Sequence, residues 1–518
     1  MSATSALLLL AGGVYVVLTV GLIVFGVNLA VLSVVAARRG RVEPGDVTAS
    51  SELPTVTVQV PIYNELYVAE RVVDAVARLD YPADRLQIQV LDDSTDETVE
   101  VVAAAVARAR AGGTEIVHVR RHERTGFKAG ALAEGLRTST GELVAVFDAD
   151  FVPEPDFLVR AVQLFDDDVA FVQARWGHLD REHSWLTRMQ AVAIDGHFLV
   201  EQAARGERGW WFNFNGTAGV WRRAAIDDAG GWQAETLTED LDLSYRAHLR
   251  GWRGRFAEDL VVPGEIPAQL PGFRRQQHRW ARGSLECARK LLPAVWRSGE
   301  RLGVKVQASL HLLSYAIHLL LVGVVLLYPV VVLAAEEHPQ LRTLAGLAYP
   351  FALFSLAPLL FFVVGQVRGG RSWVRAVPQM AVLTLIGPGM MVNTARAALA
   401  ILRRPDEGFE RTAKFGLGVA EPAGAWQQQR YQLAPDRIVV AELLLGSYAL
   451  GAAWLALDHR NWAILTYAAL FGTGLVVLAV ATIGQDLGVR RRRAERESRR
   501  RDEQRAVAAL AIDGRSAP

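Results

Sequence analysis

Five long apolar runs constrain this chain more than any other feature of its sequence. Each run is long enough to cross, as a helix, the roughly 30 Å hydrocarbon core of a bilayer. Hydrophobic residues make up 51% of the 518 residues, and they are concentrated in these runs. The sequence therefore excludes a purely soluble protein and predicts a multi-pass membrane protein. The predicted spans are 6–37, 309–335, 344–367, 438–457 and 462–483.

Basic residues flank these runs unevenly. Arg38, Arg39 and Arg41 follow the first run, whereas residues 1–5 before it carry no basic side chain. By the positive-inside rule, the N-terminus lies outside and the next segment lies in the cytoplasm. The arginine-rich tail at 490–505 is placed inside for the same reason. We expect an integral protein of a plasma, inner or Golgi-like membrane, with its polar domain in the cytoplasm.

A further apolar segment, 377–402, is interrupted by Gly387, Pro388 and Gly389. Glycine and proline can break a helix, so this segment either spans once or returns as a re-entrant or interfacial hairpin. Only the hairpin leaves the basic cluster at 403–414 on the same side as the other basic segments. We therefore favour five spans plus a hairpin.

Between the first two spans the sequence changes character. Short β-branched segments alternate with alanine-rich helical segments, which is typical of βαβ units around a mostly parallel sheet. The predicted strands are 55–61, 86–91, 115–119, 143–147 and 170–173. The predicted domains are an N-terminal helix with a basic linker (1–50), a cytoplasmic α/β domain (51–305), a channel-like membrane region (306–489) and a basic cytoplasmic tail (490–518).

A loop of acidic and hydroxyl residues, 92–96, follows the predicted strand at 86–91. In a doubly wound sheet, ligands bind beyond the carboxyl ends of the strands. The carboxylates of Asp92 and Asp93 could therefore accept hydrogen bonds from the base or ribose of a nucleotide. The alternative is a loop whose side chains only cap the next helix.

Asp148 and Asp150 stand two residues apart, directly after the predicted strand at 143–147. Such a pair can bind a hard divalent cation together with a diphosphate. Lys128 could lie near a phosphate. The alternatives are solvated acids in a turn and a surface lysine. We favour phosphate and metal chemistry because two carboxylate loops and a lysine occur in one domain.

Two further motifs lie near the end of the α/β segment. Glu239 and Asp240 precede an amphipathic helix, where a carboxylate in isolation is best explained as a helix cap. Arg279 can clamp a diphosphate, and Trp280 can stack on the apolar face of a sugar, with Gln276 one turn earlier. This second motif also suits a helix at a membrane surface.

Other chemistries find no support in the sequence. We find no Walker loop, no dinucleotide-binding glycine motif after the first strand, no zinc spacing and no nucleophile elbow. Basic and acidic side chains nearly balance, 56 against 55, so the charge predicts no nucleic-acid partner. Cys287 is the single cysteine, which excludes an intramolecular disulfide.

Six motifs follow one another in order: Pro61-Ile62-Tyr63-Asn64-Glu65, 92–96, Lys128-Ala129-Gly130, Asp148-x-Asp150, Thr238-Glu239-Asp240 and Gln276-x-x-Arg279-Trp280. Together they resemble family 2 glycosyltransferases of the cellulose synthase group. The longer stretches look most similar to the plant cellulose-synthase-like A and C enzymes, which are mannan and glucan synthases. The resemblance covers about 53–300 and extends to Phe409-x-x-Thr412-x-Lys414, which is similar to the family's gating-loop motif.

The resemblance implies a GT-A fold and a role for individual residues. Asp240 would be the general base, with Glu239 beside it. Asp148 and Asp150 would bind the phosphates and a Mg²⁺ or Mn²⁺ ion. The donor would be bound by Tyr63, Glu65, Asp92, Asp93, Lys128 and Asp148. The diphosphate and the acceptor would be held by Gln276, Arg279 and Trp280, with 212–219 lining the acceptor site and Phe409, Thr412 and Lys414 forming a gating loop.

The resemblance implies an inverting hexosyltransferase that uses GDP-mannose or UDP-glucose. We expect it to extend a β-linked polysaccharide processively and to export the product. The alternative is a glycolipid synthase that transfers one sugar to a membrane lipid. A non-catalytic transporter or receptor is less favoured, because it has no need for Asp240. The expected partners are a nucleotide sugar, a glycan or lipid acceptor and membrane lipids, without nucleic acid.

Overall fold

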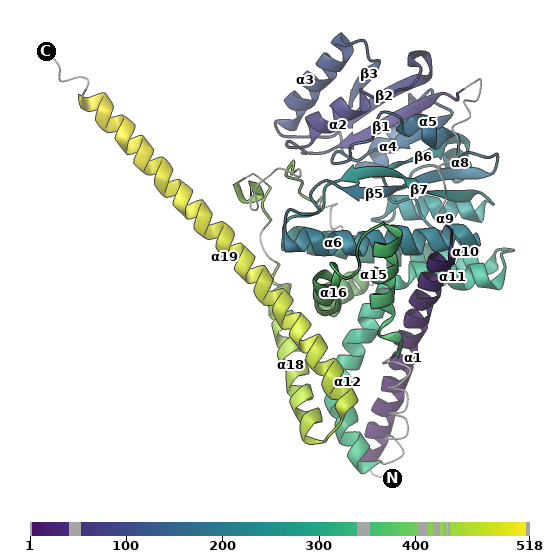
Figure 1. Cartoon of the computed structure of the whole chain (residues 1–518), viewed down its shortest axis with the longest axis vertical. Helices are drawn as coiled ribbons and strands as arrows, with labels where there is room; N and C mark the ends of the chain where they lie inside the picture. The colour runs from purple at the N-terminus through teal and green to yellow at the C-terminus, as the bar shows by residue number, and fades with distance from the viewer. Residues whose placement is uncertain are drawn as a thin grey trace.

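The computed structural model describes residues 3–40, 53–338, 353–401, 412–417, 425–428, 431–433 and 436–513. Two parts are visible: an α/β domain built on one sheet, and a group of long helices that extends away from it (Figure 1). Phe409, from the predicted gating loop, lies outside the described residues.

A seven-stranded sheet forms the centre of the α/β domain, in the order β3-β2-β1-β4-β6-β5-β7. β1 to β4 are parallel, β6 is antiparallel to β4 and β5, and β7 is parallel to β5. The sequence predicted the first five strands but missed β6, which is only four residues long, and β7, whose pairing with β5 contains two register shifts. The strands are β1 (Val56–Ile62), β2 (Leu86–Asp92), β3 (Ile116–Arg120), β4 (Leu143–Val146), β5 (Val169–His178), β6 (Gly219–Arg222) and β7 (Arg253–Gly264).

Both faces of the sheet are buried. Successive side chains of a strand point to opposite faces, so Ala145 joins one core cluster while Val144 and Val146 join the other. Helices α2, α3 and α5 cover the first face, and α4, α8 and α9 cover the second. Their bounds are α2 (Ala69–Val76), α3 (Thr98–Ala111), α4 (Phe127–Arg137), α5 (Phe157–Val162), α8 (Arg223–Asp228) and α9 (Glu239–Leu249), with the short helix η1 (Ala83–Arg85) before β2.

A layer of helices separates the sheet from the membrane helices, with α6 and α10 lying between them (Figure 1). The first part of this layer is α6 (Trp185–Gly196), the π-helix η2 (His197–Gln202) and α7 (Ala203–Arg208). The second part is α10 (Leu270–Arg297), α11 (Leu302–Leu312) and the turn η3 (Ser314–Ala316). This layer contributes residues to the candidate site described below.

Within the described part of the chain, four helices are long and apolar enough to cross a membrane, which supports the prediction of a membrane protein. Their apolar segments are Ala6–Arg38, Ser314–Glu337, Ile438–Asp458 and Trp462–Arg492. They belong to α1 (Ala3–Arg38), α12 (Ile317–Glu337), α18 (Ile438–Asp458) and α19 (Trp462–Asp513). The predicted span 344–367 begins outside the described residues, and its described part forms the shorter helix α15 (Ala357–Arg368). A count of five spans therefore stays a prediction.

The segment 377–402 forms two helices, α16 (Val377–Gly389) and α17 (Met391–Ala400), which meet at an angle of 41°. The bend follows directly after Gly387, Pro388 and Gly389. This geometry fits either a broken span or a re-entrant hairpin, so the hairpin also stays a prediction. A short turn, η5 (Ala425–Gln428), lies between this pair and α18.

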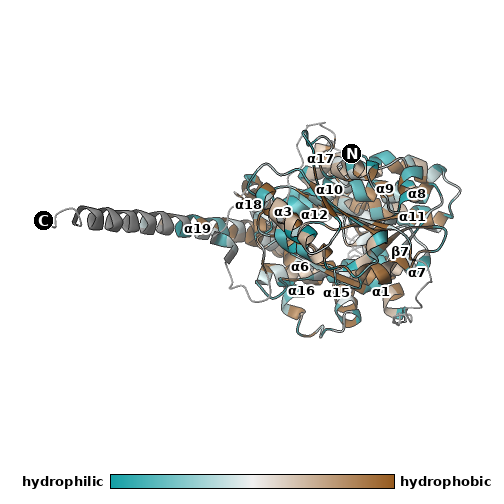
Figure 2. Ribbon diagram, turned by 90° about the horizontal axis from the view of Figure 1, so that it is seen from above, coloured by the Kyte–Doolittle hydropathy of each residue, from teal (hydrophilic) through white to brown (hydrophobic). Residues whose placement is uncertain are grey.

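The helix α16 packs closely against α19. A Cβ atom added to Gly474 of α19 would lie 2.2 Å from the carbonyl oxygen of Leu385, so only glycine fits at this crossing. Small residues at a crossing allow close backbone approach between membrane helices. Beyond this contact, α19 projects away from the rest of the molecule in both views (Figure 1 and Figure 2).

Candidate active site

The predicted site residues meet in one cleft at the carboxyl ends of β1, β2 and β4. The cleft encloses about 1250 Å³ of empty space, part of it open to solvent. Because β1 and β2 end at the paired residues Ile62 and Asp92, the loops that follow them start side by side. The predicted residues that line this cleft are Tyr63, Glu65, Asp93, Lys128, Asp148, Asp150, Glu239, Asp240, Gln276, Arg279, Trp280, Thr412 and Lys414.

Asp92 is the exception among the described candidates, because the structure does not place it in the cleft. Its side chain is fully buried and lies 2.9 Å from the imidazole of His118. Its other oxygen accepts the backbone N–H of Ser94 at 2.8 Å. His118 holds the pKa of Asp92 below its ordinary value despite the opposing effect of burial. Asp92 therefore shapes the loop that presents Asp93.

Two arginines that the sequence analysis missed support the end of the cleft formed by Tyr63 and Asp93. The Nε of Arg121 donates to Asp93 at 2.9 Å, and the Arg121 guanidinium also binds the backbone of the turn before α4. The guanidinium of Arg124, which lines the cleft, stacks 3.4 Å from the centre of the Tyr63 ring. Because both arginines lie in an irregular loop after β3, no periodic pattern marks them.

Lys128 contacts two carboxylates from different elements: Asp148 follows β4, and Glu239 begins α9. Its Nζ lies 2.6 Å from Asp148 and 3.8 Å from Glu239, and it donates to the carbonyl of Gly216 at 2.9 Å. Although burial would lower the pKa of Lys128, Asp148 and Glu239 raise it, so the ammonium stays charged. A fixed cation in a cleft is suited to binding a phosphate group.

Asp150 is held by the segment that follows the bent helix pair. The Nζ of Lys414 lies 2.5 Å from Asp150 and 2.6 Å from the carbonyl of Glu265. The carboxylate of Glu265 in turn accepts the backbone N–H groups of Gly416 and Leu417. Sequence reasoning missed Glu265, which follows β7 and fixes the 412–417 segment over the cleft.

The carboxylates of Asp148 and Asp150 both line the cleft, so they offer oxygen ligands of the type that the predicted metal takes. Mg²⁺ commonly uses one or two carboxylates and takes its other ligands from water and substrate phosphates. Among the described residues, no group of three or more His, Cys, Asp or Glu side chains surrounds a common point. A cation at this site would therefore take its remaining ligands from water and from a bound phosphate group.

Asp240 lies in the first turn of α9, beside Glu239. Burial raises the pKa of Asp240 to about 7, the Glu239 carboxylate adds to the increase, and Lys128 opposes it. Gly216 has φ +81° and packs against this residue: an added Cβ would lie 3.0 Å from Asp240 and 3.3 Å from Lys128. The pKa of Asp240 is thus close to the range in which a carboxylate serves as a general base near neutral pH.

Gln276, Arg279 and Trp280 project from α10 into the same cleft, since residues three and four apart share a helix face. The preceding turn of α10 is anchored to the membrane helices. Arg274 forms a buried two-pronged ion pair with Glu442 of α18, at 2.5 and 2.7 Å, and also contacts Thr482 of α19. Glu442 stands within an apolar run, where the sequence analysis assigned it no role.

The segment 212–219, which was expected to line the acceptor site, has some side chains in the hydrophobic core and others facing a cavity. Phe212 and Phe214 are buried in the core under the sheet. Asn213 and Asn215 face a second cavity beside the cleft, and Gly216 lines the cleft itself. Only part of the segment is thus exposed to a ligand.

Comparison with known proteins supports the class defined by this fold and site. Residues 54–283 match the family model "Glycosyltransferase like family 2". The α/β domain of this chain therefore matches family 2 glycosyltransferases over most of its length, and its mixed sheet confirms the expected GT-A-like fold.

The most similar relatives include plant enzymes. The chain is 46% identical over 255 residues to "Glucomannan 4-beta-mannosyltransferase 2" of Arabidopsis thaliana, covering 48% of each protein. It is 43% identical over 255 residues to "Glucomannan 4-beta-mannosyltransferase 1" of Oryza sativa subsp. japonica, covering 48% of this chain and 49% of that protein. The chain thus matches about half the length of these curated relatives.

Among solved structures, the chain is similar to the mannosyltransferase PcManGT of Pyrobaculum calidifontis, solved in complex with GDP-Man and Mn²⁺. The identity is 24%, the TM-score is 0.48, and the match covers 69% of this chain and 98% of that chain.

Proposed function

We propose that the protein is a membrane-embedded inverting glycosyltransferase that transfers a hexose from a nucleotide sugar to a β-linked glycan. One observation carries the proposal. A single cleft combines a carboxylate of raised pKa, Asp240, with the lysine-bound carboxylates Asp148 and Asp150. The first can accept a proton, and the others can hold a divalent cation that binds a diphosphate leaving group.

The chemistry follows from these side chains. Asp240 accepts the proton of the acceptor hydroxyl while that oxygen attacks the anomeric carbon of the donor sugar. The bond from this carbon to the diphosphate oxygen breaks, and the displacement inverts the configuration. Lys128 and Arg279 line the cleft where they can bind the departing diphosphate. Asp148 and Asp150 would hold a Mg²⁺ or Mn²⁺ ion, which when bound stabilises negative charge on that diphosphate.

We favour GDP-mannose as the donor because the relatives that cover the domain are named as mannosyltransferases. UDP-glucose is the second candidate. The test is a donor screen with purified full-length protein that follows GDP and UDP release and sizes the product. Long products support processive synthesis, whereas single-sugar products would refute it. Absence of nucleotide release with either metal would overturn the enzymatic proposal.

The alternative of single transfer to a membrane lipid rests on the position of the site against the apolar helices. Extraction of labelled product into organic solvent separates the two functions, because a glycolipid partitions there and a glycan does not. We also propose the predicted orientation, with the N-terminus outside and the 51–305 domain, the 403–414 cluster and the tail in the cytoplasm.

A further inference from the structure

A second cavity continues from the active-site cleft toward the membrane helices. It encloses about 1330 Å³ of empty space and shares Asp240, Asn215 and Trp280 with the cleft. The donor-side residues Asp93 and Asp148 line the cleft but not this cavity. The second cavity therefore lies on the acceptor side of Asp240.

Two polar side chains of the π-helix η2, His197 and Glu201, face this cavity. The Nδ1 of His197 lies 3.1 Å from Glu201, and its Nε2 lies 3.0 Å from the side-chain oxygen of Asn215. The exposed fractions of the His197 and Glu201 side chains are 32% and 21%. π-Helical turns are rare and often occur at functional sites, where they redirect side chains.

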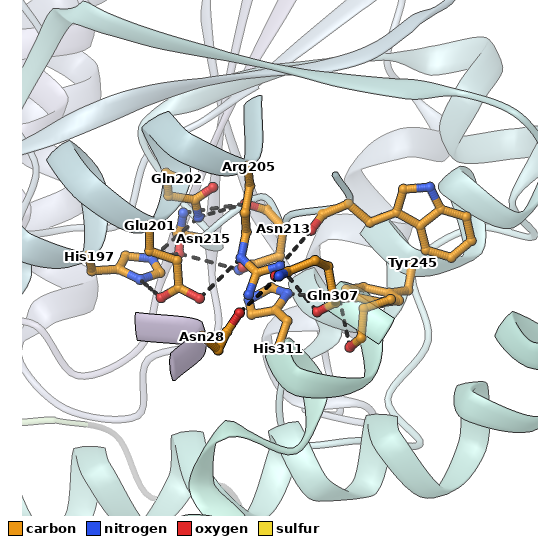
Figure 3. A network of polar contacts seen from close by, with 12 residues as sticks. Asn28, His197, Glu201, Gln202, Arg205, Asn213, Asn215, Tyr245, Gln307 and His311 are labelled. Carbon is orange, nitrogen blue, oxygen red and sulfur yellow. Dashed lines mark hydrogen bonds and ion pairs between the residues drawn. The ribbon is translucent and has the colours of Figure 1, made fainter. Parts of the chain in front are cut away.

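A network that includes buried polar side chains outside the cavity lining supports His197 and Glu201 (Figure 3). The second oxygen of Glu201 accepts from the Nε of Arg205 at 3.2 Å. Arg205, 1% exposed, donates to the backbone carbonyl of Gln307 on α11, and the Gln307 side chain donates to Asn28 of α1. The pair therefore has a fixed orientation in the absence of any ligand.

The charge state of Glu201 also suits a binding role. His197 and Arg205 hold the pKa of Glu201 well below its ordinary value, although burial alone would raise it. Neutralising the charge of Arg205 requires only the carboxylate of Glu201. A purely structural ion pair would therefore explain neither the contact of Glu201 with His197 nor the exposure of both side chains to the cavity.

We propose that His197 and Glu201 form an acceptor subsite, in which the Glu201 carboxylate accepts hydrogen bonds from ring hydroxyl groups of the acceptor sugar and His197 holds that carboxylate in place. The proposal rests on the proposed transferase function and selects a glycan as the acceptor. Trp176, Phe273 and Tyr315 line the same cavity, and aromatic rings can pack on the apolar faces of a sugar. A lipid chain would instead leave an ionised carboxylate facing hydrocarbon, which is costly.

The test measures initial rates of the full-length protein with a labelled donor and a β-1,4-linked mannan oligosaccharide as acceptor. His197→Ala removes the imidazole, and Glu201→Asp withdraws the carboxylate while keeping the charge that Arg205 needs. The matched control is Asn28→Ala: Asn28 accepts from the Gln307 side chain, whereas Arg205 is held by the Gln307 backbone carbonyl, so this change leaves the support of the pair in place, and Asn28 does not line the cavity.

We expect each cavity variant to raise the KM for the oligosaccharide by about tenfold or more, since hydrogen bonds to charged groups contribute about this much. The KM for the donor, and nucleotide release without acceptor, should stay within about twofold, as should all parameters of Asn28→Ala. Loss of thermal stability with an unchanged acceptor KM would overturn the subsite, as would a product that extracts into organic solvent. If the unaltered protein releases no nucleotide from any donor, the proposed function itself fails, and the subsite fails with it.

Discussion

At the scale of single residues, a substitution of Asp240 can distinguish a catalytic role of this residue from a structural one. Asp240→Asn keeps the size of the side chain but removes its ability to accept a proton. Turnover should fall by at least ~10²-fold, the usual lower range for general-base catalysis, with donor affinity preserved. If Asp240 only caps α9, the variant should retain near-normal turnover, because Asn caps a helix about as well as Asp. Steady-state rates and donor binding by calorimetry distinguish these outcomes.

Asp150→Asn serves as the matched comparison in the same cleft. One charged ligand of the proposed cation is lost, so we expect weaker donor binding that shows a reduced dependence on Mg²⁺ or Mn²⁺. Donor titrations with and without the ion measure this directly. Equal donor affinity with both ions in the variant and the unaltered protein would remove Asp150 from the metal site.

The raised pKa of Asp240 also predicts a pH dependence. The carboxylate accepts a proton only in its ionised form, so turnover should decline below about pH 7, roughly tenfold for each further unit. Because Glu239 contributes to the raised value, Glu239→Gln should move this decline to lower pH. A pH–rate profile of both proteins is the measurement. A profile that is flat from pH 5 to 7 would contradict the assignment of the base.

At the scale of elements, α10 depends on the buried ion pair between Arg274 and Glu442. Their side chains are 3% and 0% exposed, and removing one partner of such a pair costs about 3–5 kcal/mol. We expect Glu442→Ala to lower the thermal stability of the detergent-solubilised protein clearly. The double variant Arg274→Met/Glu442→Leu should recover most of this loss, because no charge then remains buried. Equal melting of all three proteins would show that the pair contributes nothing.

The arrangement of these elements explains which site residues could be predicted from the sequence and which could not. Asp148 and Asp150 were predictable because they follow a buried strand, and strand ends meet at one edge of a sheet. Asp92 carries the same local signal as Asp93, but its buried carboxylate is paired with the distant His118 and with the backbone of Ser94 and does not line the cleft. Arg124, Glu265 and the η2 network depend on contacts between segments far apart in the chain, which no local pattern records.

At the scale of the whole molecule, the proposed orientation can be tested with single cysteines. The native Cys287 is buried, so a membrane-impermeant maleimide should not label the unaltered protein. His338→Cys, at the end of α12, should be labelled from outside intact cells. Asp406→Cys, which lies outside the described residues, should be labelled only after the membrane is opened, because the proposed hairpin would keep 403–414 in the cytoplasm. External labelling at 406 would instead make the bent pair α16–α17 a full span, and the positive-inside assignment would then fail for this cluster.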